Sequence, residues 1–377
     1  MRVIRVACDV FALANVGVQG LHPYQPGKPI EELQRELGLD SVVKLASNEN
    51  PLGPSPLAMA AAQTALKQSH LYPDASGFEL KKKLAAKLAV HENQFTLGNG
   101  SNDVLDLIAR TFLSAGSSAV FSQYAFIVYP IAVQAVGARA IVTPAKNWGH
   151  DLDAMAAAIE ADTKVVFIAN PNNPTGNYLG REALSAFLAK VPEHVIVVLD
   201  EAYVEFAGVD DFPNGLTFLG DYPNIIVTRT FSKAYGLAGL RIGYGVSSPQ
   251  IADLLNRVRA PFNVSIPAMS AAVAVLDDQD YLTRSQQVNS AGMLQLCSGF
   301  DALGLAYIPS VGNFVAVELP CDAMPVYQAL LKEGVIVRPV GVYQMPKHLR
   351  VSIGLEHENA RFLCALQKLK SEGVLDQ

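Results

Sequence analysis

The chain has 377 residues and a mass of 40.4 kDa, a length that suggests roughly two or three domain-sized units. Half of the residues are hydrophobic and 17% are charged, so the chain can bury a large core and is not expected to be disordered. Its net charge of −6 excludes the broad cationic surface of a nucleic-acid-binding protein, and we expect no nucleic-acid partner.

The first residues raise the question of export. Arg2 and Arg5 precede a mostly apolar run, Val6 to Val18, which faintly resembles a signal peptide. Asp9 and Asn15 interrupt that run. No apolar stretch reaches the ~18 residues of a membrane span. We therefore expect a cytoplasmic protein that does not associate with membranes.

The cysteines carry no recognisable pattern. Neither a CxxC pair nor a run of cysteine and histidine with zinc spacing is present. We expect no metal site, and we expect the thiols to be small core side chains. The cysteines are Cys8, Cys297, Cys321 and Cys364.

The N-terminal part, residues 20–56, is rich in Gly, Pro and Asn, and only Ile30 to Leu37 has the pattern of a short amphipathic helix. From about residue 95, β-rich runs alternate with helical patterns such as Val104 to Phe112, which predicts an α/β sheet. A strand that is apolar at every position, such as Val195–Leu199, is typical of a parallel strand covered on both faces. The candidate strands are Ser118–Phe121, Ala138–Val142, Val165–Ala169, Val195–Leu199, Ile225–Thr228 and Ile242–Val246.

The C-terminal part has a different pattern. Residues 267–303 read as mainly helical, and shorter strands and helices then follow as a smaller α+β unit. We expect an N-terminal arm over residues 1–45 that packs with this small unit, a large domain over 46–278 and a small domain over 279–377.

In open parallel sheets, ligands bind outside the carboxyl ends of the strands. The run Asn170–Gly176 follows one candidate strand and contains two prolines, which fix a rigid loop whose Asn172 and Asn173 amides can donate from a preset position. A plain Asn-Pro turn is the alternative. Asp200, with Tyr203 three residues on, follows the next strand; a carboxylate there is costly unless it meets a cation, although a lone aspartate is more often a cap or turn residue.

A third motif contains an isolated lysine. Lys233 lies among small and apolar neighbours, and a lysine desolvated in this way readily becomes a nucleophilic amine. Thr230 and Ser232 place hydroxyls beside it, and Arg241 follows eight residues later, beyond two glycines. This combination suits a phosphate with an aldehyde beside it; a solvated surface loop is the less favoured alternative.

Weaker signals lie elsewhere in the chain. Ser101 or Asn102 is expected to cap a helix whose free amides form an anion site. Arg338 and Arg350 follow or lie in short strands, where a guanidinium binds carboxylate or phosphate bidentately, although a surface salt bridge is the commoner role. Taken alone, the aromatic residues Tyr72 and Phe126 are core candidates.

Asn170–Gly176, Asp200–Tyr203 and Ser232–Arg241, in this order and spacing, resemble the fold-type I aminotransferases, which use pyridoxal 5′-phosphate (PLP). The resemblance runs from about Leu21 to the C-terminus and implies a mostly parallel central sheet in a large domain plus a smaller α+β domain. Within this superfamily the chain is similar to the histidinol-phosphate aminotransferases. The runs that carry this second similarity are His22–Gly27, Lys44–Ser55 and Tyr72–Asp74.

The resemblance also implies roles for single residues. Lys233, Asp200 and Tyr203 are implied as catalytic: Lys233 binds PLP covalently, Asp200 pairs with the pyridine nitrogen, and Tyr203 and Asn173 hold the ring hydroxyl oxygen. Phe126 is implied to stack on the ring, with Tyr124 as a competitor. The implied phosphate ligands are Thr230, Ser232, Arg241 and the amides of Ser101 and Asn102.

The implied partners are a second copy of the chain and small substrates. Tyr72 would reach the cofactor phosphate of a partner subunit, which makes the active unit a homodimer. Arg350 would bind the carboxylate of glutamate or the phosphate of histidinol phosphate, and Arg338, Tyr24 and Asn173 would line the substrate end.

The implied reaction transfers an amino group between L-histidinol phosphate and 2-oxoglutarate, giving imidazole-acetol phosphate and L-glutamate, a step of histidine biosynthesis. An aromatic amino-acid aminotransferase and a threonine-phosphate decarboxylase share much of the pattern and are the alternatives. A transcription regulator would need a DNA-binding segment that the chain lacks room for, and a dehydrogenase would need a glycine fingerprint.

Overall fold

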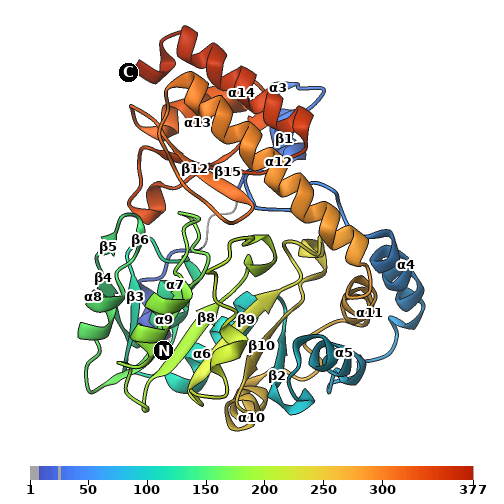
Figure 1. The fold of residues 1–377 in the computed structure, drawn as a ribbon, viewed down its shortest axis with the longest axis vertical. Helices are drawn as coiled ribbons and strands as arrows, with labels where there is room; N and C mark the ends of the chain where they lie inside the picture. Colours follow the sequence, from blue (N-terminus) through green and yellow to red (C-terminus); the bar gives the residue numbers. More distant parts are fainter. Residues whose placement is uncertain (1–7, 24–26, 377) are drawn as a thin grey trace, which may run out of the picture.

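The computed structural model describes residues 8–23 and 27–376, which form two packed units (Figure 1). The larger unit contains a seven-stranded sheet in the order β2-β10-β9-β8-β7-β3-β4. Only β10 runs antiparallel to its neighbours, so the sheet is mostly parallel, as expected. Its strands are β2 (Phe95–Gly98), β3 (Ser118–Ser122), β4 (Arg139–Thr143), β7 (Thr163–Ala169), β8 (Ile196–Asp200), β9 (Ile225–Thr230) and β10 (Gly243–Ser247).

Helices cover both faces of this sheet, which explains why its central strands are apolar throughout. Side chains alternate between the two faces of a strand, and in β8 Val197 and Leu199 belong to one hydrophobic cluster while Val198 belongs to another. The helices of the large unit are α4 (Pro56–Ala65), α5 (Phe78–Leu88), α6 (Ser101–Phe112), α7 (Val128–Ala135), α8 (Leu152–Ala157), α9 (Arg181–Leu188), α10 (Pro249–Val258) and α11 (Ile266–Val275). A small hairpin, β5 (Ala145–Lys146) and β6 (Gly149–His150), follows β4.

The start of α6 differs from the prediction. The N-cap is Gly100 and the helix begins at Ser101, so neither Ser101 nor Asn102 is the cap. The strand β2 directly precedes this turn and pairs with β10, although no strand was predicted there. Four residues are too short for a period-2 pattern to identify a strand, and only the pairing with β10 defines it.

The smaller unit contains an antiparallel sheet in the order β11-β12-β15-β14, with helices packed against one face. Its core cluster includes Leu349 and Val351 of β15, together with Phe362. The elements are β11 (Tyr307–Ile308), β12 (Phe314–Glu318), α13 (Ala323–Lys332), β13 (Val335–Ile336), β14 (Arg338–Pro339), β15 (His348–Ser352) and α14 (Glu356–Ser371).

One long helix and the N-terminal segment connect the two units. Helix α12 (Gln279–Leu303) runs from the large unit along the small one (Figure 1), with Tyr281 in the core of the former and Phe300 in the core of the latter. In the N-terminal segment, α3 (Ile30–Leu37) packs near α13, and β1 (Val43–Lys44) pairs in parallel with β13. Two short helices, α1 (Val10–Leu13) and α2 (Val16–Gln19), precede them. The proposed domain borders stay a prediction.

In the described part of the chain, no helix combines the length and the apolar character that crossing a membrane requires, and no three potential metal ligands cluster. The cysteines meet the expectation in part: Cys321 is buried in the core of the small unit and Cys297 packs against that core, whereas Cys8 and Cys364 are exposed. Cys364 lies on the outer face of α14. Its exposure follows from its position in the helical repeat, although its side chain is apolar.

Candidate active site

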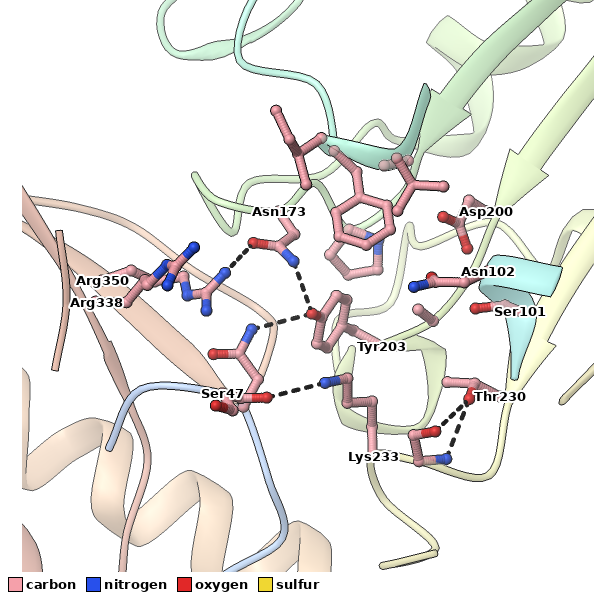
Figure 2. Close-up of a pocket in the computed structure, with 18 of the residues that line it drawn as sticks. Ser47, Ser101, Asn102, Asn173, Asp200, Tyr203, Thr230, Lys233, Arg338 and Arg350 are labelled. Carbon is pink, nitrogen blue, oxygen red and sulfur yellow. Dashed lines mark hydrogen bonds between the residues drawn. The ribbon is translucent and has the colours of Figure 1, made fainter. Parts of the chain in front are cut away.

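A pocket lies where the carboxyl ends of β7, β8 and β9 face the small unit (Figure 2). It brings together most of the predicted site residues, because the ends of neighbouring parallel strands meet at one edge of a sheet. The predicted residues that line it are Ser101, Asn102, Phe126, Asn173, Asp200, Tyr203, Thr230, Ser232, Lys233, Arg241, Arg338 and Arg350. Tyr72 does not line the pocket, and Tyr24 lies outside the described residues.

Lys233 follows β9 and extends its amine into the pocket. Its Nζ donates to the backbone oxygen of Ser47 at 3.1 Å and lies 5.7 Å from the centre of the Tyr203 ring. Burial lowers the pKa of Lys233 to about 7, and the positive charges of Arg350 and Arg241 act in the same direction. Near neutral pH a large share of this amine is therefore unprotonated and nucleophilic.

Asp200 ends β8 and is buried at the wall of the pocket. Its Oδ1 accepts from the hydroxyl of Thr228, and its Oδ2 accepts from the hydroxyl of Tyr129, both at 2.9 Å. The β8–β9 register places Thr228 directly opposite Asp200. Burial raises the pKa of Asp200 to about 6, while the two hydroxyl donors favour its charged form. A cation held beside this carboxylate would lower its pKa further.

The Tyr203 hydroxyl accepts hydrogen bonds from the side-chain amides of Asn48 and Asn173, each at 3.0 Å. Burial raises the pKa of Tyr203 to about 12, so the phenol keeps its proton at neutral pH. The hydroxyl accepts from two amides and still carries its own hydrogen, so it keeps the capacity to donate one hydrogen bond.

An anion cradle lies at the start of α6. Gly100 has φ +82°, and a Cβ there would lie 2.8 Å from Nη2 of Arg241, while a Cβ at Gly243 would lie 2.5 Å from the amide of Ser101. Both glycines therefore permit a close approach of backbone and guanidinium. The Ser232 hydroxyl accepts from Arg241 at 3.3 Å and from Thr230 at 3.0 Å. Helix amides, hydroxyls and a guanidinium gathered in this way fit a phosphate.

Two arginines lie at the small-unit end of the pocket. Arg350 donates from Nη1 to Oδ1 of Asn173 at 2.6 Å and from Nη2 to the backbone oxygen of Ala46 at 2.8 Å, and its buried Nε has no hydrogen-bond partner among the described residues. Arg338 lies directly opposite it across β14 and β15. Like charges at opposite positions of a strand pair repel, so this arrangement favours an anionic ligand.

Of the two aromatic candidates for stacking on a ring, only Phe126 lines the pocket. It packs edge-on against Tyr129, with ring centres 5.9 Å apart. Tyr124 instead packs against Trp148, with ring centres 5.2 Å apart. The geometry therefore favours Phe126 for that role.

Tyr72 lies on the surface of the large unit. Its side chain is 82% exposed and stacks on the ring of Phe262, with centres 4.7 Å apart. Within one chain it contributes nothing to the pocket.

Several residues of the site were missed by sequence reasoning. Asn48 belongs to the run Lys44–Ser55, which carried the family resemblance but gave no role to this side chain. Ser47, Thr228 and Tyr129 contribute through contacts made only in the folded chain.

The sequence profile of the family "Aminotransferase class I and II" matches residues 40–366. The chain belongs to that family. It is 63% identical over 367 residues to "Histidinol-phosphate aminotransferase 2" of Pseudomonas fluorescens, covering 97% of this chain and 99% of that protein. It is 62% identical over 363 residues to the protein of the same name from Pseudomonas aeruginosa, covering 96% and 98%.

A solved structure agrees with this assignment. The histidinol-phosphate aminotransferase of Sinorhizobium meliloti, determined in complex with pyridoxal-5′-phosphate, superposes with a TM-score of 0.87 at 32% identity. The match covers 94% of this chain and 97% of that one.

Proposed function

We propose that this protein is a PLP-dependent aminotransferase that transfers an amino group between L-histidinol phosphate and 2-oxoglutarate, giving imidazole-acetol phosphate and L-glutamate in histidine biosynthesis. The observation that carries the proposal is one pocket that joins the low-pKa amine of Lys233, the enclosed carboxylate of Asp200 and an anion cradle. The names of the relatives support the choice of substrates.

The residues of the pocket fit PLP. The cradle formed by Ser101, Asn102, Thr230, Ser232 and Arg241 would hold its phosphate. When bound, PLP supplies an electron sink for the bond that breaks at the substrate α-carbon.

The side chains around the ring would control its protonation and position. Asp200 would hold a proton on the ring nitrogen, because a carboxylate beside a cation favours the charged pair. Tyr203 and Asn173 would hold the ring oxygen, and Phe126 would pack on the ring face.

Lys233 has two roles in the proposal. It would anchor the cofactor, and its free amine would be the general base that takes the proton from the substrate α-carbon. A pKa of about 7 suits this role, since a general base works best when its pKa lies near the working pH.

The two arginines account for the pair of substrates. The guanidinium of Arg350 matches either a carboxylate or a phosphate, and Arg338 opposite it adds a second positive charge. One site would accept the two substrates in turn, which predicts ping-pong kinetics.

The active unit in this proposal is a homodimer, with Tyr72 reaching the phosphate of the partner subunit's cofactor. The surface around Tyr72 supports an interface, because Leu71, Phe78 and Phe262 are also large and exposed there. A cytoplasmic location stays a prediction that cell fractionation would test.

The decisive experiment is a visible absorbance titration of the purified protein with L-histidinol phosphate after incubation with PLP. We expect a cofactor band that converts to the pyridoxamine form, and we expect Lys233→Ala to abolish turnover while the fold survives. A protein without any cofactor band would refute the whole proposal. Conversion by phenylalanine alone would point to an aromatic aminotransferase, and release of carbon dioxide from threonine phosphate would point to a decarboxylase.

A further inference from the structure

The strand β15 presents one row of side chains to the large unit and the N-terminal segment. Residues His348, Arg350 and Ser352 alternate along β15 and so share a face, whereas Leu349 and Val351 point into the small core. Ser352 bonds to Asn48 through its hydroxyl at 3.0 Å, and Arg350 bonds to Asn173 at 2.6 Å. Arg350 is therefore the middle residue of this row, and the residues on either side of it, His348 and Ser352, also contact residues outside the small sheet.

At the other end of this row, His348 contacts the large unit through its ring. His348 is 3% exposed, and its two ring nitrogens have no hydrogen-bond partner among the described residues. It packs against Trp148 of the large unit, with ring centres 4.8 Å apart and planes at 63°. This ring contact joins the first residue of β15 to the large unit.

The backbone at Trp148 is unusual for a tryptophan. Asn147 and Trp148 form the two-residue turn between β5 and β6, with φ of +50° and +65°. Hairpin turns with positive φ at both central residues favour Asn-Gly, because a side chain at the second position is strained. A bulky residue held at such a position points to a role for its side chain.

The surroundings of Trp148 also border the pocket. Trp148 and Tyr124 pack against the cluster that contains Tyr343, and Tyr343 lines the pocket. The adjacent residue of the small unit, Gln344, accepts a hydrogen bond of 2.9 Å from Gln123 of the large unit. The two units are therefore joined at this edge of the pocket by both rings and amides.

We propose that Trp148 is a positioning residue for substrate binding: through His348 it fixes the end of β15 and so holds Arg350 in place for the substrate anion. The proposal rests on the proposed function, in which Arg350 binds the carboxylate or phosphate. Trp148 itself touches neither cofactor nor substrate in this scheme.

The test compares Trp148→Gly with Trp148→Phe and with Asn147→Gly. Trp148→Gly relieves the turn but removes the ring, Trp148→Phe keeps a ring, and Asn147→Gly changes the same turn without touching His348. We expect Trp148→Gly to raise KM for both substrates roughly tenfold or more, since small displacements of a positioning group cost this much. We expect the cofactor absorbance to be unchanged and kcat to change less than KM. Trp148→Phe and Asn147→Gly should stay near the wild-type KM.

A double-mutant cycle with His348→Ala tests whether Trp148 acts on Arg350 through His348. If Trp148 acts through His348, the effects of Trp148→Gly and His348→Ala on KM will not multiply in the double variant. His348→Ala carries the test alone if Trp148→Gly does not fold. Wild-type KM values in Trp148→Gly or in His348→Ala, or full multiplication in the double variant, would overturn the inference. Absence of turnover in the wild type would instead overturn the proposed function.

Discussion

The Tyr129 hydroxyl donates a hydrogen bond of 2.9 Å to Oδ2 of Asp200, joining the first turn of α7 to the end of β8. Tyr129 is completely buried and stacks on Phe167, with ring centres 4.8 Å apart. Burial raises the pKa of Tyr129 well above its usual range, and the charge of Asp200 adds to the shift. The phenol is therefore a permanent donor that favours the charged form of Asp200.

We expect Tyr129→Phe to raise the pKa of Asp200 and to weaken cofactor binding. A hydrogen bond to a charged group contributes about 1.5–3 kcal/mol, so PLP affinity should fall roughly ten- to a hundredfold. Titration with PLP, together with an upward shift of the acidic limb of the kcat/KM profile, measures the effect. Tyr124→Phe is the matched control, because that ring lies outside the pocket lining. Equal PLP affinities in the wild type and Tyr129→Phe would contradict the role of Tyr129.

The low pKa of Lys233 has a consequence for stability without cofactor. Its pKa in the folded chain is about 7, below the ordinary value of 10.5, so the unfolded chain binds more protons between these values. Stability from this group therefore rises as the pH rises from about 7 to about 10.5. The difference in unfolding free energy between the wild type and Lys233→Met, both free of PLP, should grow in favour of the wild type over this range. A flat difference would contradict the lowered pKa.

Arg350→Ala should raise KM for both substrates, because both anions would share its guanidinium. Loss of a charged hydrogen-bonding partner costs about 1.5–3 kcal/mol, which corresponds to roughly ten- to a hundredfold in KM. Arg350→Lys keeps the charge but loses the two-pronged geometry of the guanidinium, so its KM values should lie between those of the wild type and those of Arg350→Ala. Steady-state kinetics with each substrate varied in turn measure this. An effect on only one substrate would argue against a shared anion site.

The proposed homodimer, in which Tyr72 reaches the partner subunit's site, predicts complementation between two inactive or weakened variants. Tyr72→Ala should weaken cofactor binding, and Lys233→Ala should abolish activity. In a mixed dimer, one of the two sites receives the intact lysine and the intact partner tyrosine. Because the two sites of a symmetric dimer are equivalent, mixing the two variants under subunit exchange should restore roughly a quarter of wild-type activity. No recovery after confirmed exchange would count against a role of Tyr72 across the interface.

A buried ion pair lies behind the site. Arg229 donates to Oε2 of Glu201 from Nε at 2.9 Å and from Nη2 at 2.7 Å, and both side chains are buried. Glu201→Ala would leave a buried guanidinium without its counter-charge and should lower the free energy of unfolding by about 3–5 kcal/mol. Denaturant unfolding measures this loss.

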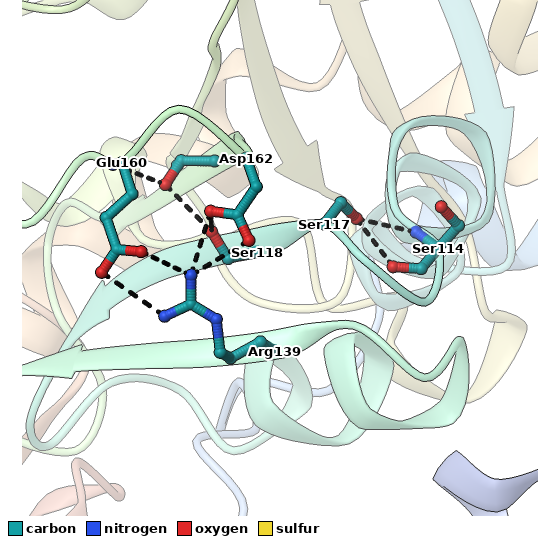
Figure 3. Close-up of polar contacts among 7 residues, drawn as sticks. Ser114, Ser117, Ser118, Arg139, Glu160 and Asp162 are labelled. Atoms are coloured by element: carbon teal, nitrogen blue, oxygen red, sulfur yellow. Dashed lines mark hydrogen bonds and ion pairs between the residues drawn. The ribbon is translucent and has the colours of Figure 1, made fainter.

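The surface network of Arg139 provides the comparison for that experiment. Arg139 on the edge strand β4 contacts Glu160 at 2.6 Å and Asp162 at 3.0 Å (Figure 3), but its side chain is 49% exposed. Arg139→Ala should change stability far less than Glu201→Ala, because water and salt screen exposed pairs. Equal losses in the two variants would contradict the importance of burial.

The sequence alone determined the class of fold and most of the pocket. Continuous apolar runs such as Val195–Leu199 identify buried parallel strands. Because the carboxyl ends of neighbouring parallel strands lie at one edge of a sheet, the motifs found at those ends could be predicted to form one pocket. Lys233 was identifiable because it is isolated among small and apolar neighbours. Asp200 took its role from the family resemblance, because a lone aspartate after a strand is more often a cap or turn residue.

Only the tertiary structure decided which side chains support them. The bonds of Tyr129 to Asp200 and of Asn48 to Tyr203 join residues 71 and 155 positions apart, and no local pattern encodes such pairs. The ring contact of Trp148 with His348 depends on a positive φ and on how the two units pack. Periodicity reports which face of an element is buried, whereas the partner on the other side is set by the packing of the whole chain.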